Sequence, residues 1–523
     1  MNKRALSLLL ALLLAMTAFS LASAEDEEIV ITIQAPSFGG LPNETIVGKA
    51  WEDYIRTETG KNIVFKYQYI PWGEIADKQK IAFAANDFPD LVSVSAYNAA
   101  VPYLDQGIFV ELSQYQDLMP NYLAYAKKSN KGLDAIYDAN GHFYGFHTAS
   151  DPRLSRGLGI YNATLYRYDT FEANGIDIPE TVDEFADAAA QLKAIYPDKY
   201  PVAWNKGASR WFQTFNGMFW DGQHYTYGPA TENWKLFLEY SAKLYGMDVL
   251  DPDSLGRMSK DDLTTKALNG SLFMVMSEWF NYTSEWYVND QFDGLWVNSL
   301  FPENEEMGYS WWNVDNVNEY DLQLDSHFVV INASTKVDVE LLVKICDLAY
   351  TEECTRLVTW GIEGLTYEKG EDGLIHFVDS IRNAQNPWEE GNKYGMRASA
   401  SYRPGLQLCL DSRAFIDFAP VEPSYINGEV VYVSWEEAFP DYEWPTDKHI
   451  TPEIFAPTLQ WSVEESQNNS KLETAVTTYV DECTVKFITG EMNLNEDWDN
   501  YVAKLNELGL DEWVNAYNEK AGV

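Results

Sequence analysis

The sequence predicts an α/β protein built as two lobes, with a hinge and a ligand-binding crevice between them. At 523 residues the chain is too long for a single hydrophobic core. Its composition, 46% hydrophobic and 15% aromatic, is enough to fill two cores. Strand and helix patterns alternate in two separate stretches, and no low-complexity linker sets two independent domains apart. Several short crossings between the lobes would suit a hinge.

The first of these stretches predicts a β-α-β-α-β unit. Residues 29–34, 62–70 and 90–95 have the short apolar or alternating pattern of strands, and residues 45–59 and 75–85 have helical spacing. Strands separated by helices imply parallel pairing with right-handed crossovers. In such a sheet the ligand crevice lies at the carboxyl ends of the strands.

A second unit of the same kind is predicted after the loop at residues 151–156. Thr181 and Glu184 form a capping box that opens a helix. Further strands are expected at 159–162, 200–204 and 271–277, and helices at 234–245 and 262–268. A strand at 327–332 and a helix at 337–350 are interpreted as a return to the first lobe. We therefore expect an N-terminal lobe of residues 25–150 and 326–400 and a C-terminal lobe of residues 151–325 and 401–523.

The first 24 residues have the pattern of a signal peptide. Lys3 and Arg4 give a positive start, an apolar run follows, and Ala22 and Ala24 are small residues at the positions that a signal peptidase reads. We expect an exported protein, in the periplasm or on the extracellular face of the cell envelope. No Cys lies near the cleavage site, so the sequence leaves open how the protein is retained at a membrane.

Charge and cysteine content exclude several classes of partner and site. Without Lys3 and Arg4 the mature chain has 35 basic and 80 acidic residues, a formal net charge of −45. Such a field repels the phosphates of nucleic acids. Four Cys residues in so long a chain are not a disulfide framework, and none forms a C-x-x-C pair. Cys346 and Cys354 could form a disulfide only if their helix breaks between them, which Thr351 as a new N-cap would permit.

Signatures of catalysis are missing from the sequence. It contains no G-x-S-x-G, no H-E-x-x-H and no phosphate-binding Gly-rich loop, and it has only six His. His142 and His147 are better explained as ordinary loop or strand residues than as a base or ligand. The acidic turn Asp251-Pro-Asp253 lacks the spacing of a calcium loop and is interpreted as solvated. We expect no enzyme activity, no metal and no cofactor.

Aromatic residues give the positive signal. Several Trp residues follow predicted strands or lie in polar loops, where a crevice at the strand ends would expose them. A sugar has a flat apolar face that stacks on an aromatic ring and a rim of hydroxyl groups that bind carboxylates and amides. The residues concerned are Trp72, Trp204, Trp211, Trp279, Trp311 and Trp312. The alternative for any one of them is a place in the core, since Trp is highly buried on average.

Six stretches of the sequence carry a resemblance to one family. They are residues 84–90 (AANDFPD), 106–112 (QGIFVEL), 138–146 (DANGHFYGF), 268–279 (LNGSLFMVMSEW), 361–367 (GIEGLTY) and 498–510, which opens with WDNY and ends with LGL. In this order along an exported chain they resemble the extracellular solute-binding proteins of carbohydrate ABC importers, both maltose-binding-protein-like and LplA-like. The resemblance spans nearly the whole mature chain and implies the type II periplasmic-binding-protein-like fold.

The resemblance also implies a function and a set of contacts. The chain would bind an oligosaccharide between its lobes as a monomer and deliver it to the permease subunits of an ABC transporter. Trp279 is similar to the stacking Trp of maltose-type binders, and the loop from Asp87 to Asp90 to their sugar-hydroxyl contact. Some relatives bind acidic sugars near a calcium loop, which this sequence lacks, so a neutral sugar is favoured. Besides the Trp residues, the expected ligand contacts are Asp87, Asp90, Arg156, Asn205 and Glu278.

Two rival interpretations stay open from sequence. A secreted carbohydrate-active enzyme would also need aromatic rings and a carboxylate pair, and would release product. A binder of a peptide or of another solute would differ only in its ligand, because a fold does not fix a function.

Overall fold

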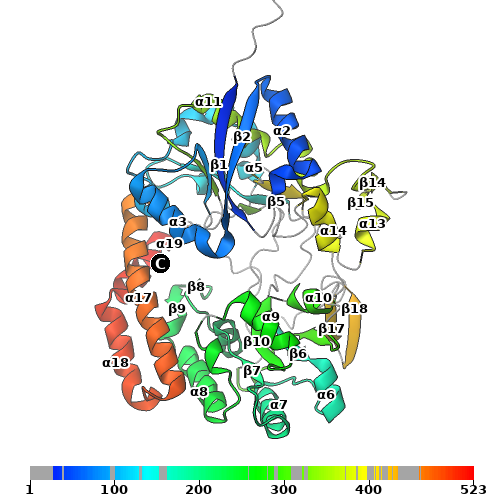
Figure 1. Ribbon diagram of the computed structural model, residues 1–523. Coiled ribbons are helices and arrows are strands. Elements are labelled where there is room, and N and C mark those ends of the chain that lie inside the picture. The colour runs from blue at the N-terminus through cyan, green and yellow to red at the C-terminus, as the bar shows by residue number, and fades with distance from the viewer. Residues whose placement is uncertain are drawn as a thin grey trace, which may run out of the picture.

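The computed structural model has two α/β lobes, shown one above the other in Figure 1. It describes residues 28–37, 41–94, 100–128, 132–151, 162–256, 258–279, 281–287, 292–307, 321–322, 328–370, 373–384, 387–396, 406, 408–411, 414, 422–426, 428–433, 457, 459 and 461–523.

The N-terminal lobe is built on a five-stranded sheet in the order β2-β1-β3-β13-β4. Its strands are β1 (Ile29–Ser37), β2 (Ile63–Pro71), β3 (Leu91–Val94), β4 (Gly145–His147) and β13 (Phe328–Ile331). β1 pairs in parallel with both β2 and β3, as predicted. β13 is antiparallel to β3 and β4, so β4 runs in the same direction as β1. The predicted return of the chain to this lobe near residue 328 is therefore confirmed.

Helices cover this sheet, and their ends follow local sequence signals. They are α2 (Ile46–Thr59), α3 (Trp72–Ala85), α5 (Pro120–Lys128), α11 (Val339–Leu348) and α12 (Glu352–Trp360). The Thr45 side chain caps α2, and Gly60, with a φ of 64°, ends it. α11 ends at Leu348 and Thr351 caps α12, so the helix does break between Cys346 and Cys354. The thiols of Cys346 and Cys354 are nevertheless buried and free.

The C-terminal lobe is built on a six-stranded sheet in the order β18-β17-β11-β6-β10-β7. Its strands are β6 (Asn162–Arg167), β7 (Val202–Ala203), β10 (Met274–Trp279), β11 (Trp296–Ser299), β17 (Glu422–Ile426) and β18 (Glu429–Val433). β6 is antiparallel to both β10 and β11, so the expected parallel repeat of the first unit is wrong for β6, whereas β7 and β10 do pair in parallel. The direction differs because β6 carries the chain outward from the other lobe, whereas β10 and β11 carry it back.

The helices of this lobe include α6 (Tyr168–Asn174), α7 (Val182–Ile195), α8 (Glu232–Gly246), α9 (Lys260–Leu268) and α10 (Asn281–Tyr287). The predicted capping box of Thr181 and Glu184 opens α7. The hairpin of β8 (Met218–Trp220) and β9 (Tyr225–Tyr227) also belongs to this lobe. A second hairpin, β14 (Tyr367–Lys369) and β15 (Ile375–Phe377), and the short helices α13 (Asp379–Arg382) and α14 (Pro387–Tyr394) pack beside α2 and α12 of the N-terminal lobe.

Three chain segments that pass between the lobes pair with one another in what we call the crossover sheet. Its strands are β5 (Ala149–Asp151), β12 (Asp321–Leu322) and β16 (Cys409–Asp411), with β5 in the middle. β5 lies between β4 and β6 in sequence, β12 between β11 and β13, and β16 precedes β17. Leu406, Leu408 and Cys409 pack in the core of the N-terminal lobe, so the lobe boundary expected at residue 400 falls too early.

The C-terminal helices are α17 (Val463–Thr489), α18 (Leu494–Glu507) and α19 (Leu510–Ala521). α17, about 40 Å long, lies along the side of both lobes (Figure 1). Its first residue, Val463, packs in a core cluster with Phe83 and Phe328 of the N-terminal lobe. Its second half, including Val480 and Phe487, packs in the core of the C-terminal lobe. Among the described helices, none is both long and apolar enough to cross a membrane.

Candidate functional site

Strand direction decides which residues of the C-terminal lobe lie beside the crossover sheet. β6 follows β5 along the chain, so its first residue, Asn162, lies at the edge of the sheet nearest the other lobe. β10 runs the opposite way, and its last residues, Glu278 and Trp279, pair with Ala163 and Asn162. β7 is parallel to β10 and ends just before Trp204 and Asn205. The ends of β7 and β10 therefore lie together at this edge, which we call the hinge-facing edge.

Asn205 and Glu278 are in direct contact at the hinge-facing edge. The Asn205 side-chain amide donates from Nδ2 to Oε2 of Glu278 over 3.2 Å. Its Oδ1 accepts from the backbone N–H of Gly207 over 2.8 Å, as the N-cap of a 3₁₀ helix at Lys206–Phe212. Because Oδ1 is held by a donor, the amide orientation is fixed, and its N–H group points to the carboxylate.

Close packing holds the Asn205 turn against β10. A Cβ atom at Gly207 would lie only 2.6 Å from Oγ of Ser277, so a larger residue here would force the Ser277 side chain to shift. Ser277 itself is fully buried. The pairing of β10 with β6 also shifts register between Val275 and Glu278. Such irregularities re-aim side chains at strand ends, and Glu278 is half-buried here. Sequence analysis missed Gly207, although an Asn-x-Gly turn directly after a strand is a usable signal.

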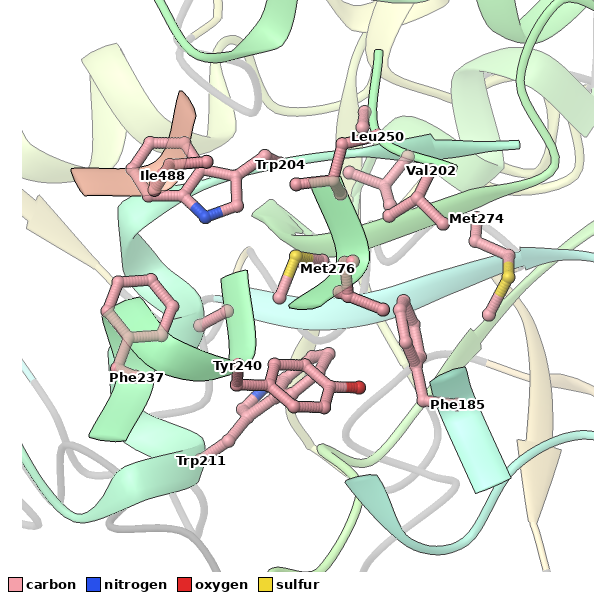
Figure 2. Close-up of a cluster of buried hydrophobic side chains, with 14 of the residues drawn as sticks. Phe185, Val202, Trp204, Trp211, Phe237, Tyr240, Leu250, Met274, Met276 and Ile488 are labelled. Carbon is pink, nitrogen blue, oxygen red and sulfur yellow. The ribbon is translucent and has the colours of Figure 1, made fainter. Parts of the chain in front are cut away.

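Trp204 and Trp211 lie in the core, which corrects their expected contact with a ligand. Figure 2 shows both indoles among the apolar side chains of the C-terminal lobe. Trp204 is 5% exposed, stacks on Phe237 and donates from Nε1 to Ser241. Trp211 is not exposed at all. Their burial leaves neither ring a face for a ligand, because both turn away from the edge into the core between the sheet and α8.

Asp87 and Asp90 lie at the wrong end of the N-terminal sheet, which corrects their expected role. Both precede β3, whereas the hinge-facing ends of β1 and β3 are their carboxyl ends. The Asp90 carboxylate accepts hydrogen bonds from the backbone and hydroxyl of Thr32 and from the hydroxyl of Thr335. Asp90 thus joins the strands of the sheet. Asp87 is exposed on the same loop.

The remaining predicted contacts are placed only in part. Trp72 opens α3 directly after β2, and Trp279 ends β10, so both backbones lie at carboxyl ends of strands. Their side chains lie outside the described part of the structure. Arg156, Trp311 and Trp312 lie wholly outside it, as do residues 95–99, which follow the carboxyl end of β3.

The other polar candidates from sequence have structural roles. Lys266 Nζ lies 2.5 Å from Oδ2 of Asp251 and 2.7 Å from Oδ2 of Asp253. This acidic turn is therefore paired with an internal cation, and Asp251 is buried rather than solvated. The hydrogen bond from Lys266 and its positive charge lower the pKa of Asp253. His147 is buried, with Nδ1 2.8 Å from the Tyr122 hydroxyl. Within the described ranges, no group of His, Cys, Asp and Glu side chains is arranged to hold a metal ion.

Solved structures define the class of this fold. The alginate-binding protein AlgQ2 in its calcium-free form matches with a TM-score of 0.72 at 15% identity, over 96% of this chain and 99% of that one. The substrate-binding protein FusA of the Streptococcus pneumoniae ABC transporter, solved with kestose, matches with a TM-score of 0.68 at 15% identity, over 94% of this chain and 99% of that one. The fold is that of the two-lobe solute-binding proteins.

Sequence comparison points to one family. A family model described as "Bacterial extracellular solute-binding protein" matches residues 42–297, just under half of the chain. Lipoprotein LipO of Bacillus subtilis (strain 168) is 28% identical over 209 residues, which is 39% of this chain and only 38% of LipO. The polygalacturonan/rhamnogalacturonan-binding protein YtcQ of the same strain is 20% identical over 473 residues, 86% of this chain and 84% of YtcQ.

Proposed function

We propose that this chain is the exported substrate-binding component of an ABC importer and that it binds an oligosaccharide between its two lobes. The signal peptide of residues 1–24 would be removed, and the monomer would pass its ligand to permease subunits without changing it covalently. The proposal is supported by the family and by relatives whose names mention sugar polymers or whose structure holds kestose.

The observation that carries the proposal is the meeting of strand ends beside the crossover sheet. β7 and β10 of one lobe and β1, β2 and β3 of the other all end toward it. Asn205 and Glu278, an amide and a carboxylate in contact, lie at the ends of β7 and β10, and the backbones of Trp72 and Trp279 lie at the ends of β2 and β10. Hydroxyl groups suit the amide and carboxylate, and sugar rings suit the two aromatic residues.

Ligand contacts from both lobes would favour a closed arrangement. A ligand shifts a two-state equilibrium by its difference in affinity for the two states, and contacts from the second lobe exist only when the lobes close. The three strands of the crossover sheet are the segments about which the lobes would rotate. Arg156, Trp311 and Trp312 belong to the proposed ligand contacts on the sequence argument alone.

The test is a thermal-shift screen of the mature protein against a panel of oligosaccharides, followed by calorimetry on the best ligand. A binding protein melts at a higher temperature with its ligand, and the sugar is recovered intact by chromatography. Product formation would instead indicate a carbohydrate-active enzyme.

Trp279→Ala tests the contact set directly. Loss of a stacking ring should weaken binding by more than about 1 kcal/mol. The melting temperature of the unliganded variant serves as the control for folding. An unchanged heat of titration and affinity would remove Trp279 from the site.

A further inference from the structure

The hairpin of β8 and β9 carries an indole that the proposed contact set does not include. We propose that Trp220, the last residue of β8, forms an outer subsite, where it stacks on a sugar ring beyond those held at the hinge-facing edge. Such a subsite favours long oligosaccharides over short ones. This inference rests on the proposed function and deepens it, because it names a property of the ligand, its length, and the residue that senses it.

Trp220 differs from the core indoles of this lobe in its exposure. Trp211 and Trp234 are fully buried, whereas Trp220 is only half-buried. Its ring makes a T-shaped contact with Tyr225, with centroids 5.2 Å apart and ring planes at 61°. A contact of this geometry covers at most one face of the indole. The rest of the half-buried ring is therefore accessible to a ligand.

Contacts with α19 hold the hairpin in one position. The Tyr225 backbone N–H donates to Oδ1 of Asn518 over 2.6 Å, and Nδ2 of Asn518 donates to the Tyr225 carbonyl over 3.1 Å. Tyr227 is buried in the core of the C-terminal lobe beside Trp513, with ring centroids 5.3 Å apart. A ring on a fixed support loses little conformational freedom when it binds, which lowers the cost of binding.

The hairpin lies on the side of the C-terminal lobe that faces the N-terminal lobe. Figure 1 shows β8 and β9 on this side, next to α17. Lys520, in the same last turn of α19 as Asn518, pairs with Glu465 in the first turn of α17 at 2.8 Å. Val463, at the start of α17, packs with Phe83 of the N-terminal lobe. The hairpin is therefore attached to α19 at the level where the two lobes meet.

The hairpin is also separate from the contact between Asn205 and Glu278. Its two strands form a sheet of their own and do not pair with the six-stranded sheet that ends at the hinge-facing edge. Along the chain, the 3₁₀ helix Lys206–Phe212, about 14 Å long, lies between Asn205 and the hairpin. A ring stacked on Trp220 is therefore a different unit of the ligand from one that binds at the hinge-facing edge.

The turn after Trp220 adds polar groups beside the indole. Oδ1 of Asp221 accepts from the backbone N–H groups of Gln223 over 2.8 Å and of His224 over 2.7 Å, which fixes the shape of the turn. All three of these residues are exposed. An indole with a carboxylate, an amide and an imidazole next to it suits the apolar face and the hydroxyl rim of a sugar. This combination points to a carbohydrate as the occupant.

The experiment compares the mature protein with three variants by calorimetry. The ligands are malto-, cello-, xylo- and galacturono-oligosaccharides of two to six units, so that length varies within each series while the chemistry stays constant. Trp220→Ala removes the ring, and Trp220→Phe keeps a smaller ring in its place. Tyr432→Ala removes a 48% exposed ring from β18, at the opposite edge of the sheet from β7, and is the matched control. Unliganded melting temperatures check that each variant folds.

We expect affinity to rise with length in the series that binds. Trp220→Ala should weaken binding of the longest member at least about fivefold and of the shortest member that binds by less than about twofold. Trp220→Phe should lose less than Trp220→Ala, and Tyr432→Ala should leave both affinities unchanged. An equal loss for short and long members, or no loss for either, would overturn this inference alone. Absence of binding to every series would overturn the proposed function as well, so the two failures are distinguishable.

Hydroxyl-radical footprinting read by mass spectrometry tests the contact itself. The longest member should protect Trp220 from modification, and the shortest should not. Tyr432 should be modified to the same extent with either. Full modification of Trp220 in the presence of the longest member would overturn the inference even where the affinity of Trp220→Ala falls.

Discussion

Asp90 and Glu278 are two carboxylates at opposite ends of their strands, since Asp90 precedes β3 and Glu278 lies near the end of β10. Asp90 precedes β3 and accepts hydrogen bonds from Thr32 N–H at 2.8 Å, Thr32 Oγ1 at 2.6 Å and Thr335 Oγ1 at 2.5 Å. Glu278 lies near the end of β10, half-buried, and accepts a hydrogen bond from the Asn205 amide. The comparison teaches that the end of the strand, more than the residue type, decides whether a carboxylate joins the strands of its sheet or lies at the hinge-facing edge.

The largest effect on stability should come from the core of the C-terminal lobe. Trp211→Ala removes a fully buried ring and should lower the free energy of unfolding of this lobe by about 3–5 kcal/mol. Chemical denaturation followed by circular dichroism measures this. A cost below about 1 kcal/mol would show that the ring is not core and would reopen its assignment to the ligand site.

Replacement of Asp90 should come next and should affect stability alone. Asp90→Ala leaves the N–H and hydroxyl of Thr32 without their acceptor, at a cost of about 2–3 kcal/mol to the N-terminal lobe. Ligand affinity of the folded variant should stay within about twofold. Asp87→Ala, an exposed residue of the same loop, is the matched control and should change stability by less than about 0.5 kcal/mol. Loss of ligand affinity in a folded Asp90 variant would contradict a purely structural role for Asp90.

Removal of the Asn205 side chain should weaken ligand binding more than it lowers stability. Asn205→Ala removes one hydrogen bond to the Glu278 carboxylate and the cap at Gly207. We expect the affinity for the best oligosaccharide to fall about tenfold, or about 1.4 kcal/mol, with a loss of stability near 1 kcal/mol from the missing cap. Calorimetry and denaturation measure the two effects. Unchanged affinity would exclude the Asn205–Glu278 pair from the site.

The smallest effect on stability concerns Glu465, a carboxylate whose contribution to stability depends on pH. Burial alone would raise the pKa of Glu465, but hydrogen bonds from Lys520 and Ser462 outweigh it and the pKa is lowered. An acid with a lowered pKa in the folded state stabilises the protein above its unfolded pKa, about 4.3, and loses this contribution as the pH falls through the folded value.

Glu465→Gln should therefore be less stable than the unmodified protein at pH 7, by less than about 1 kcal/mol because the side chain is 42% exposed. The difference should shrink below about pH 4. Melting temperatures across this pH range are the measurement, and a difference that grows toward acid pH would contradict the assignment.

Much of the N-terminal lobe followed from sequence, because its signals are local. Thr45 and Gly60 bound α2, and Thr351 opens α12, as the sequence permitted. Each of these signals acts through hydrogen bonds or dihedral angles within a few residues. The parallel pairing of β1, β2 and β3 followed from the helices between them.

The candidate site was predicted less well, because its members meet only through pairing of distant strands. Asn205 and Glu278 were named from sequence, yet their contact depends on β7 and β10 being neighbours. Trp204 and Asn205 are adjacent in sequence, but one side chain enters the core and the other remains at the hinge-facing edge.

The sequence by itself determined the class of fold, the positions of most helices and strands, and the set of residue types from which a sugar site could be made. Periodicity and capping decide these features, and both depend on residues that are close together in the sequence. Only the tertiary structure decided which strand edge faces the crossover sheet, which Trp residues are core, and that Asp90 serves the fold while Glu278 lies beside the hinge. Those outcomes depend on strand direction and on burial, which the chain acquires only when segments far apart in sequence pack together.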